Sequence, residues 1–171
     1  MSSRPVAVIA DARFYVGPEL CRHLAARGFD MVVGDPTDQL VEEIRSHGVQ
    51  IVRVPGGSSL DETSCSHLVS VAIEHFGRID SAVMFSGDIV TGPFVHSTID
   101  HLRRVVSGCL EAPYHFLRAL TPLMADQGSG QVLVITSAAG ARPTPDAPLY
   151  SAVRAGATLL VKNVAAEVAS H

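Results

Sequence analysis

Three side chains in the last third of the chain have the types and spacing of an acid–base site. Tyr150 and Arg154 are four residues apart, so on a helix they share one face. Ser137 precedes Tyr150 by thirteen residues and follows an apolar run. A guanidinium near a phenol favours the phenolate, which can remove a proton from a substrate. We expect Tyr150 to act as a general base, Ser137 to hydrogen-bond the substrate oxygen, and Arg154 to supply a fixed positive charge.

These side chains must be positioned by a regular alternation of strands and helices. The apolar runs predict buried parallel strands at 5–10, 29–34, 49–54, 81–85 and 131–136. Helical patterns occupy 17–27, 37–46, 61–76, 98–125 and the stretch from 148 onward. The alternation predicts an α/β fold in one domain over 1–171, with helices on both faces of a parallel sheet. Within the long helix 98–125, Gly108 and Pro113 are expected to cause irregularities.

Parallel sheets of this kind bind ligands at the carboxyl ends of their strands, near the point where the strand order reverses. The first, fourth and fifth predicted strands end at Ala10, Phe85 and Ser137. We therefore expect these three residues to open into one crevice.

The composition excludes several classes of function. The formal net charge of −4, without a basic run, argues against a nucleic-acid surface. The apolar runs are too short to cross a membrane, so the chain is expected to be cytoplasmic. Three widely spaced cysteines and scattered histidines show no ligand pattern, so we expect reduced structural thiols and no metal.

With these features the chain resembles the short-chain dehydrogenase/reductase family over nearly its whole length. The resemblance rests on the strand–helix order, on Phe-Gly-Arg-Ile-Asp at 76–80, and on the spacing of Ser137 and Tyr150. It implies a Rossmann-like, doubly wound parallel sheet with strand order 3-2-1-4-5. Members of the family continue through two more strands, so relative to them the chain is expected to be incomplete at its C-terminal end.

The family's nucleotide-binding positions are altered in this chain. Of the glycines in the first turn, 10–17, only Gly17 remains, and Asp11 and Tyr15 stand at the other two positions. A carboxylate at Asp11 would repel a pyrophosphate by about 1–4 kcal/mol at ~4 Å. The family's lysine is replaced by Arg154, which cannot release a proton near neutral pH. If NAD binds, the expected contacts are Asp11, Gly17 and Asp35, although Asp35 reads equally well as a turn residue before a proline.

These departures resemble one branch of the family, the halohydrin dehalogenases. Their patterns are Thr-x4-Phe/Tyr-x-Gly and Ser-x12-Tyr-x3-Arg; the second is complete here, and the first has Ala10 in place of threonine. The resemblance implies a lyase that converts vicinal haloalcohols to epoxides and halide, and the reverse, without a cofactor. It also implies a halide and substrate pocket lined by Phe14, Tyr15 and Ser86.

Two other functions remain open from the sequence. The first is an NAD(P)-dependent short-chain dehydrogenase or reductase, and the second is a non-catalytic sensor or scaffold. In the preferred interpretation the partners are a small haloalcohol or epoxide and a halide, with no nucleic acid and no membrane. The family resemblance further implies a homodimer or homotetramer formed through helices 98–125 and 148–170.

Overall fold

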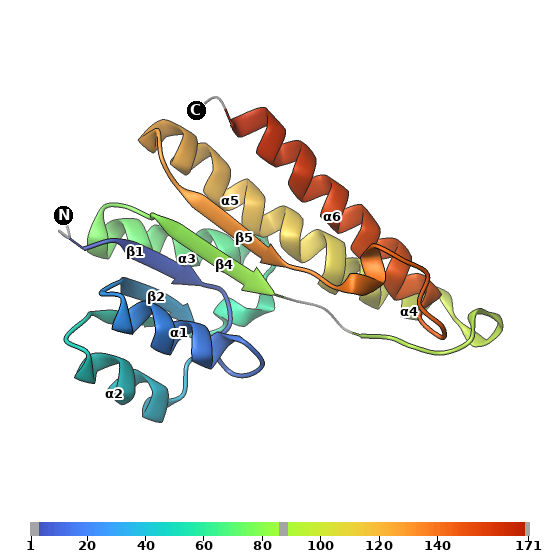
Figure 1. Ribbon diagram of the computed structural model, residues 1–171, viewed down its shortest axis with the longest axis horizontal. Coiled ribbons are helices and arrows are strands. Elements are labelled where there is room, and N and C mark those ends of the chain that lie inside the picture. The colour runs from blue at the N-terminus through green and yellow to red at the C-terminus, as the bar shows by residue number, and fades with distance from the viewer. Residues whose placement is uncertain (1–3, 86–88, 170–171) are drawn as a thin grey trace.

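The computed structural model describes residues 4–85 and 89–169. Its centre is a parallel sheet with strand order β3-β2-β1-β4-β5, which confirms the predicted order (Figure 1). The strands are β1 (Val6–Ile9), β2 (Asp30–Gly34), β3 (Ile51–Val54), β4 (Ser81–Phe85) and β5 (Gln131–Ile135). The α-helices are α1 (Gly17–Ala26), α2 (Asp38–Ser46), α3 (Glu62–Phe76), α4 (Ile99–Val106), α5 (Ala112–Gln127) and α6 (Pro148–Val168).

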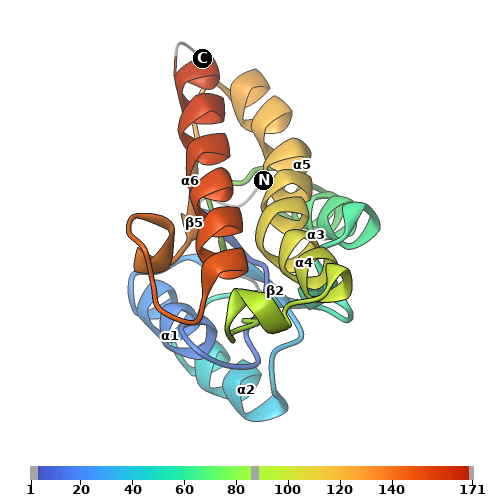
Figure 2. The same ribbon diagram turned by 90° about the vertical axis from the view of Figure 1, so that its right-hand side faces the viewer.

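Strands β1 and β2 present alternate residues to two separate cores. Ala7, Ile9, Met31 and Val33 pack against α1 and α2 on one face of the sheet. The strand residues between them pack on the other face against α3 and α5, and α6 lies alongside α5 (Figure 2). Both faces of β1 and β2 are covered, so β1 is apolar throughout and β2 is apolar after Asp30, as their continuous runs predicted.

Asp80, the last residue of the Phe-Gly-Arg-Ile-Asp motif at 76–80, stabilises the beginning of the sheet. The carboxylate of Asp80 accepts a hydrogen bond from the backbone N–H of Val6, 2.8 Å away, at the beginning of β1. The same carboxylate is paired with the guanidinium of Arg78. This motif therefore aligns β4 with β1, and so sets where the opposite, carboxyl ends of the two strands lie.

The long helix predicted over 98–125 is divided into three parts. Helix α4 ends at Val106, a π-helical turn covers Ser107–Glu111, and α5 begins at Ala112. Pro113 lies in the first turn of α5, where its missing N–H is tolerated. Gly108 lies inside the π turn, so both residues mark the irregular region as expected. The prediction of one continuous helix over 98–125 was wrong, because hydrophobic periodicity does not distinguish an α turn from a π turn.

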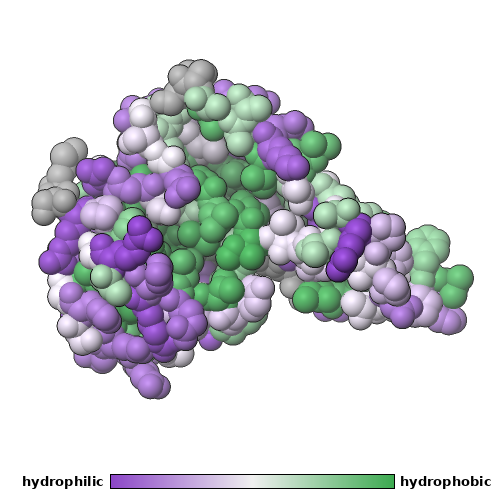
Figure 3. Space-filling model, viewed as in Figure 1, coloured by the Kyte–Doolittle hydropathy of each residue, from purple (hydrophilic) through white to green (hydrophobic). Residues whose placement is uncertain are grey.

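One part of the sheet carries no helix on the side of α1 and α2. There Leu133 of β5 has 51% of its surface exposed. Figure 3 shows apolar side chains gathered in a hollow over β4 and β5. The carboxyl ends of these two strands therefore open toward solvent beside the turn that leads into α1.

The structure also bears on what the composition predicted about the cysteines, metal binding and membrane spans. All three cysteines are buried and carry free thiols. Within residues 4–85 and 89–169, no group of three or more histidine, cysteine, aspartate or glutamate side chains could hold a metal ion. No helix in the same residues is both long and apolar enough to cross a membrane.

Candidate active site

The predicted acid–base residues come together in a pocket of about 460 Å³ at the carboxyl ends of β4 and β5. Ser137, Tyr150 and Arg154 all line it. The strand ends supply Phe85 and Ile135, and the remaining lining residues are Phe14, Tyr15, Ile89 and Thr136. The polar groups gather on the side of α6, and the aromatic rings lie on the side of the turn before α1.

Helix α6 places Tyr150 and Arg154 on its buried face. Pro148 begins the helix, which suits a residue without an N–H at a first turn. Tyr150 and Arg154 are only 8% and 5% exposed, and Tyr150 packs in a cluster with Val105 and Cys109. The guanidinium of Arg154 lies over the tyrosine ring, 5.2 Å from its centroid. The cation thus faces the ring rather than projecting into solvent.

A close approach of two backbones brings the end of β5 onto this helix. Ser137 is followed by a 3₁₀ turn, Ala138–Gly140. A Cβ atom at Gly140 would lie 2.9 Å from the backbone carbon of Arg154, so a larger residue would push the turn away from α6. Glycine at this position therefore allows the Ser137 segment to lie against the helix that carries Tyr150.

The hydroxyl of Ser137 has a structural role besides any chemical one. Its Oγ accepts a hydrogen bond from the backbone N–H of Ala139, 3.2 Å away. This bond caps the 3₁₀ turn and orients the side chain. The serine O–H is still a donor, so Ser137 can donate a hydrogen bond to a substrate oxygen in the pocket.

Three aromatic rings form the other side of the pocket. Phe85 is the nearly buried member, and Phe14 and Tyr15 both stand edge-on to it, with centroid separations of 5.6 and 5.5 Å. Tyr15 has a φ of 56°, a left-handed conformation that favours glycine. The backbone of the turn thus keeps a glycine-like path, although a tyrosine occupies it.

Asp11 stands at the first altered glycine position, and its charge is neutralised by Arg13 of the same turn. The Asp11 carboxylate is buried and accepts hydrogen bonds from the backbone N–H of Arg13, at 2.8 Å, and from its guanidinium, at 2.8–3.3 Å. This pairing raises the pKa of Arg13 above its ordinary value. The same guanidinium lies over the Phe14 ring, 5.8 Å from its centroid. The expected repulsion of a pyrophosphate by Asp11 is therefore offset by a cation two residues away.

The start of α1 retains the close packing that a nucleotide-binding turn requires. A Cβ atom at Gly17 would lie 2.3 Å from the carbonyl oxygen of Asp11, so only glycine fits. Val16, at the N-cap, has no side-chain acceptor for the first amides of the helix. Free amides at a helix N-terminus attract phosphate groups. At the start of α1, however, the N–H of Gly17 donates to the carbonyl oxygen of Phe14, 3.2 Å away, and the next residue is a proline, which has no N–H. The turn thus keeps the close backbone packing of a nucleotide-binding turn but offers few amides to a phosphate.

Asp35, at the end of β2, is engaged by a neighbouring loop. Its carboxylate accepts hydrogen bonds from the backbone N–H groups of Gly56, at 2.8 Å, and Ser58, at 3.2 Å, and from the Ser58 hydroxyl. Burial opposes its ionisation, but these hydrogen bonds and the charge of Arg13 outweigh it and lower its pKa. A ribose bound here would share a carboxylate that already holds the 56–58 loop.

The structure thus brings most of the predicted site residues to one place. Ser137, Tyr150 and Arg154 share the pocket with Phe14 and Tyr15. The possible cofactor contacts Asp11 and Gly17 belong to the adjoining turn, and Asp35 lies beyond it. Ser86 lies outside the described residues.

Sequence reasoning missed two contributors to this site. Phe85 was predicted only as the end of a strand, and its role as the base of the aromatic cluster depends on how the turn at 14–15 folds over it. Arg13 was not considered, although a cation two residues after a buried acid is a usable signal for a paired charge.

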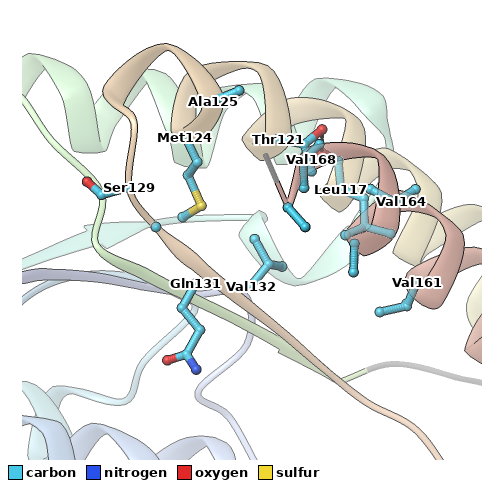
Figure 4. A pocket seen from close by; sticks show the side chains of 13 residues that line it. Leu117, Thr121, Met124, Ala125, Ser129, Gln131, Val132, Val161, Val164 and Val168 are labelled. Atoms are coloured by element: carbon cyan, nitrogen blue, oxygen red, sulfur yellow. Dashed lines mark hydrogen bonds between the residues drawn. The ribbon is translucent and has the colours of Figure 1, made fainter. Parts of the chain in front are cut away.

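A second cavity, of about 380 Å³, lies apart from this site between α5, α6 and the start of β5 (Figure 4). Its walls are mainly aliphatic side chains, among them Leu117, Val132 and Val164, with Met124 at one end. None of its lining residues is titratable between pH 4 and 10, so this cavity has no groups suited to acid–base chemistry.

Comparison with known proteins agrees with the architecture. The model of the short chain dehydrogenase family matches residues 5–171. An uncharacterized oxidoreductase of Staphylococcus epidermidis is 22% identical over 164 residues, covering 96% of this chain and 71% of its own length. A 3-oxoacyl-[acyl-carrier-protein] reductase of Synechocystis is 29% identical over 172 residues, covering 97% of this chain and 69% of the reductase.

A solved structure shows the same fold. The structure of a 7α-hydroxysteroid dehydrogenase, complexed with NADH and 7-oxo glycochenodeoxycholic acid, superposes with a TM-score of 0.87. It is 26% identical in sequence, and the match covers 97% of this chain and 66% of that one.

Proposed function

Because the chain belongs to the short chain dehydrogenase family, we propose that it contributes the active site of an NAD(P)-dependent oxidoreductase that interconverts a hydroxyl and a carbonyl group. The observation that carries the proposal is the convergence of Ser137, Tyr150 and the buried Arg154 on one pocket. The relatives support it, since they bear the names oxidoreductase and reductase, and a similar dehydrogenase was solved with NADH.

The side chains would divide the proton chemistry between them. Ser137 donates a hydrogen bond to the substrate oxygen and orients it toward Tyr150. The phenol of Tyr150 gives a proton to the carbonyl oxygen during reduction and removes one from the hydroxyl during oxidation. Arg154 acts as a fixed positive charge over the tyrosine ring, because a guanidinium does not release its proton near neutral pH.

A nicotinamide dinucleotide, when bound, supplies the hydride donor or acceptor that this chemistry requires. The N-terminal end of α1, beside Gly17, would face its pyrophosphate with the positive end of the helix dipole. Arg13 would add positive charge at the same turn, and Asp35 would face a ribose.

Cofactor-independent dehalogenation is the second candidate, and two observations favour it. The turn before α1 is occupied by the Asp11–Arg13 pair and the Tyr15 ring, and Arg154 replaces the family's lysine. In this reaction Tyr150 removes the proton of a haloalcohol hydroxyl. The resulting alkoxide attacks the neighbouring carbon, the carbon–halogen bond breaks, and halide leaves with the electron pair. The pairing of Asp11 with Arg13 weakens the case, since it neutralises the acid.

Two assays distinguish these candidates. Titration of the protein into NADH and NADPH, followed by nicotinamide fluorescence, measures cofactor binding, and ketone reduction is followed by loss of absorbance. Halide release from a vicinal haloalcohol is measured with no nucleotide present. Nucleotide binding together with nucleotide-dependent ketone reduction supports the oxidoreductase, provided that Tyr150→Phe abolishes the reduction. Halide release that Tyr150→Phe abolishes, without nucleotide binding, supports the dehalogenase. Inactivity in both assays leaves the sensor or scaffold.

We also propose that the chain self-associates through α4, α5 and α6. Tyr114 on α5 and Leu159 on α6 are half or more exposed, which supports a further apolar contact at these helices. Light scattering after gel filtration measures the oligomeric state, and a monomer at micromolar concentration argues against the proposal.

A further inference from the structure

We infer that the Tyr15 side chain is a gate to the nicotinamide position of the pocket: it closes this position in the free chain and turns out of it when a dinucleotide binds. The inference rests on the proposed function, because it concerns how the same pocket admits its cofactor. Two observations carry it. Tyr15 lines the pocket on the path that a dinucleotide must take, and it also borders a second hollow that can receive its ring.

The chemistry of the proposed reaction fixes where the nicotinamide ring must lie. Hydride passes directly between this ring and the substrate carbon, so the ring has to stand against the carbon–oxygen group that Ser137 and Tyr150 would bind. The pyrophosphate of the same molecule would face the start of α1, beside Gly17. The nicotinamide end therefore has to pass from the turn before α1 into the pocket.

Tyr15 stands on this path. It precedes Gly17 by two residues and lines the pocket together with Ser137 and Tyr150. Its ring packs against Phe85, at the end of β4, with 5.5 Å between the ring centroids and 70° between the ring planes. A nicotinamide ring that enters from the turn before α1 would meet the Tyr15 ring before it reached the substrate.

The Tyr15 ring has few contacts to hold it in place. Its side chain belongs to a residue that is 68% exposed, and within the described part of the chain its ring pairs only with that of Phe85. Phe14 differs, because the guanidinium of Arg13 lies over its ring, 5.8 Å from the centroid. Tyr15 also has a left-handed backbone, with φ 56°, and such strained residues are found at ligand clamps and switch segments. Tyr15 is therefore the ring of this turn that is able to move.

A second hollow lies on the outer side of the same side chain. It is an open groove along α1 and α2, and Tyr15 lines it together with Val16 and Leu20. Among the described residues, Tyr15 alone lines both this groove and the pocket. A change of rotamer about the Cα–Cβ bond can carry the ring from one to the other, where Val16 and Leu20 replace the apolar contact with Phe85.

The first test separates the nicotinamide end from the rest of the dinucleotide. ADP-ribose contains the adenosine, the pyrophosphate and the second ribose of NADH but no nicotinamide ring, so the closed gate does not obstruct it. Isothermal titration calorimetry measures the affinities of both ligands for the 171-residue chain. Tyr15→Gly should bind NADH about tenfold more tightly, because no aromatic contact has to break first, and should change the ADP-ribose affinity by less than about twofold.

The variants are chosen so that the fold is kept. Glycine suits the left-handed backbone at this position, and asparagine tolerates it, so Tyr15→Asn is a second ring-free variant that should repeat the gain. Tyr15→Phe is the matched control, because it keeps the ring and its contact with Phe85. It should leave the affinity for NADH unchanged.

A second measurement follows the movement of the ring itself. The chain has three tyrosines, so 3-fluorotyrosine gives three ¹⁹F NMR signals, and Tyr15→Phe identifies the signal of Tyr15. This signal should shift much further with NADH than with ADP-ribose, because only NADH displaces the ring. The signal of Tyr114, which lines neither the pocket nor the groove, should stay in place with both ligands.

The outcomes distinguish this inference from the proposed function. If the original chain and Tyr15→Gly bind NADH equally, or if the variant gains equally for NADH and ADP-ribose, the gate is overturned and the oxidoreductase stands. NADH binding that appears only in Tyr15→Gly supports the gate. A gain in NADH affinity without ketone reduction supports the gate and removes the oxidoreductase. If neither protein binds NADH or ADP-ribose, both the gate and the oxidoreductase are overturned.

Discussion

The guanidinium of Arg154 and the phenol ring of Tyr150 are in face-on contact, with 5.2 Å between the guanidinium carbon and the ring centroid. Both residues are nearly buried, so the contact is shielded from water, and a cation–π interaction is stronger when desolvated. The pair joins a residue able to carry a proton to one that keeps its charge. In the proposed reaction, the positive charge of Arg154 would therefore be held beside the tyrosine that carries the proton.

This contact predicts different results for two substitutions of Arg154. Arg154→Lys keeps a cation on the helix, so we expect the rate of the proposed reaction to stay within about tenfold of the original. Arg154→Met removes the charge and should lower the rate by more than tenfold. Steady-state kinetics with far-UV circular dichroism as a folding check makes the comparison. Full activity in a folded Arg154→Met protein would show that the cation is not required.

Two glycine-to-alanine substitutions should change the free energy of unfolding in opposite directions, because Gly17 lies against backbone atoms of the turn before α1 and Gly156 does not. Gly17→Ala places a Cβ atom against the Asp11 carbonyl oxygen and should destabilise the fold by about 2 kcal/mol or more. Gly156→Ala, inside α6 with no atom within 4 Å of the new Cβ, should stabilise it by about 0.5–1 kcal/mol. Chemical denaturation measures both. Equal effects would contradict the packing described for Gly17.

The Asp11–Arg13 pair predicts how nucleotide affinity responds to loss of the acid. Asp11→Gly removes a carboxylate from the turn and releases Arg13 to pair with phosphate. We expect NADH to bind about tenfold more tightly, because one repulsion is removed and one cation is gained. Arg13→Gln should have the reverse effect. Fluorescence titrations at two salt concentrations test this, and an affinity that neither substitution changes would exclude a pyrophosphate at this turn.

The lowered pKa of Asp35 predicts a pH-dependent contribution to stability. Because the folded-state pKa lies below the unfolded value of about 3.9, ionised Asp35 stabilises the fold at pH values above that value. The contribution is lost as the pH falls through the folded-state pKa. Asp35→Asn tolerates the left-handed backbone, φ 46°, and should lower stability at pH 7 by about 1 kcal/mol. Denaturation at pH 7 and at pH 3 should show this deficit shrinking at the lower pH.

The buried cysteines predict low thiol reactivity in the folded protein. Burial raises the pKa of Cys21 and of Cys65 to about 12, so both stay as thiols at pH 8. Iodoacetamide should therefore leave these two residues unmodified in the native state and react with all three cysteines after denaturation in urea. Mass spectrometry reads the modified positions. Rapid native labelling of Cys21 or Cys65 would contradict their burial.

The sequence by itself predicted the strands of the sheet and three residues that share the pocket. Continuous apolar runs identify strands buried on both faces, and their alternation with helices indicates a parallel sheet. The strand order was implied by the resemblance to the short-chain dehydrogenase/reductase family, and the structure has the same order, β3-β2-β1-β4-β5. The four-residue spacing of Tyr150 and Arg154 was enough to place both on one helix face. These properties are periodic or local, which is why they can be read along the chain.

Only the tertiary structure decided what surrounds those residues. Asp35 binds a loop more than twenty positions away, and Phe85 becomes the base of an aromatic cluster because the turn at 14–15 folds over it. The neutralisation of Asp11 depends on the direction of the Arg13 side chain, and the division of the helix predicted over 98–125 depends on a change in hydrogen bonding. The contacts of Asp35 and Phe85 join segments that are distant in the sequence, the Asp11–Arg13 pair depends on a side-chain rotamer, and the π turn depends on backbone hydrogen bonding. Hydrophobic periodicity encodes none of these.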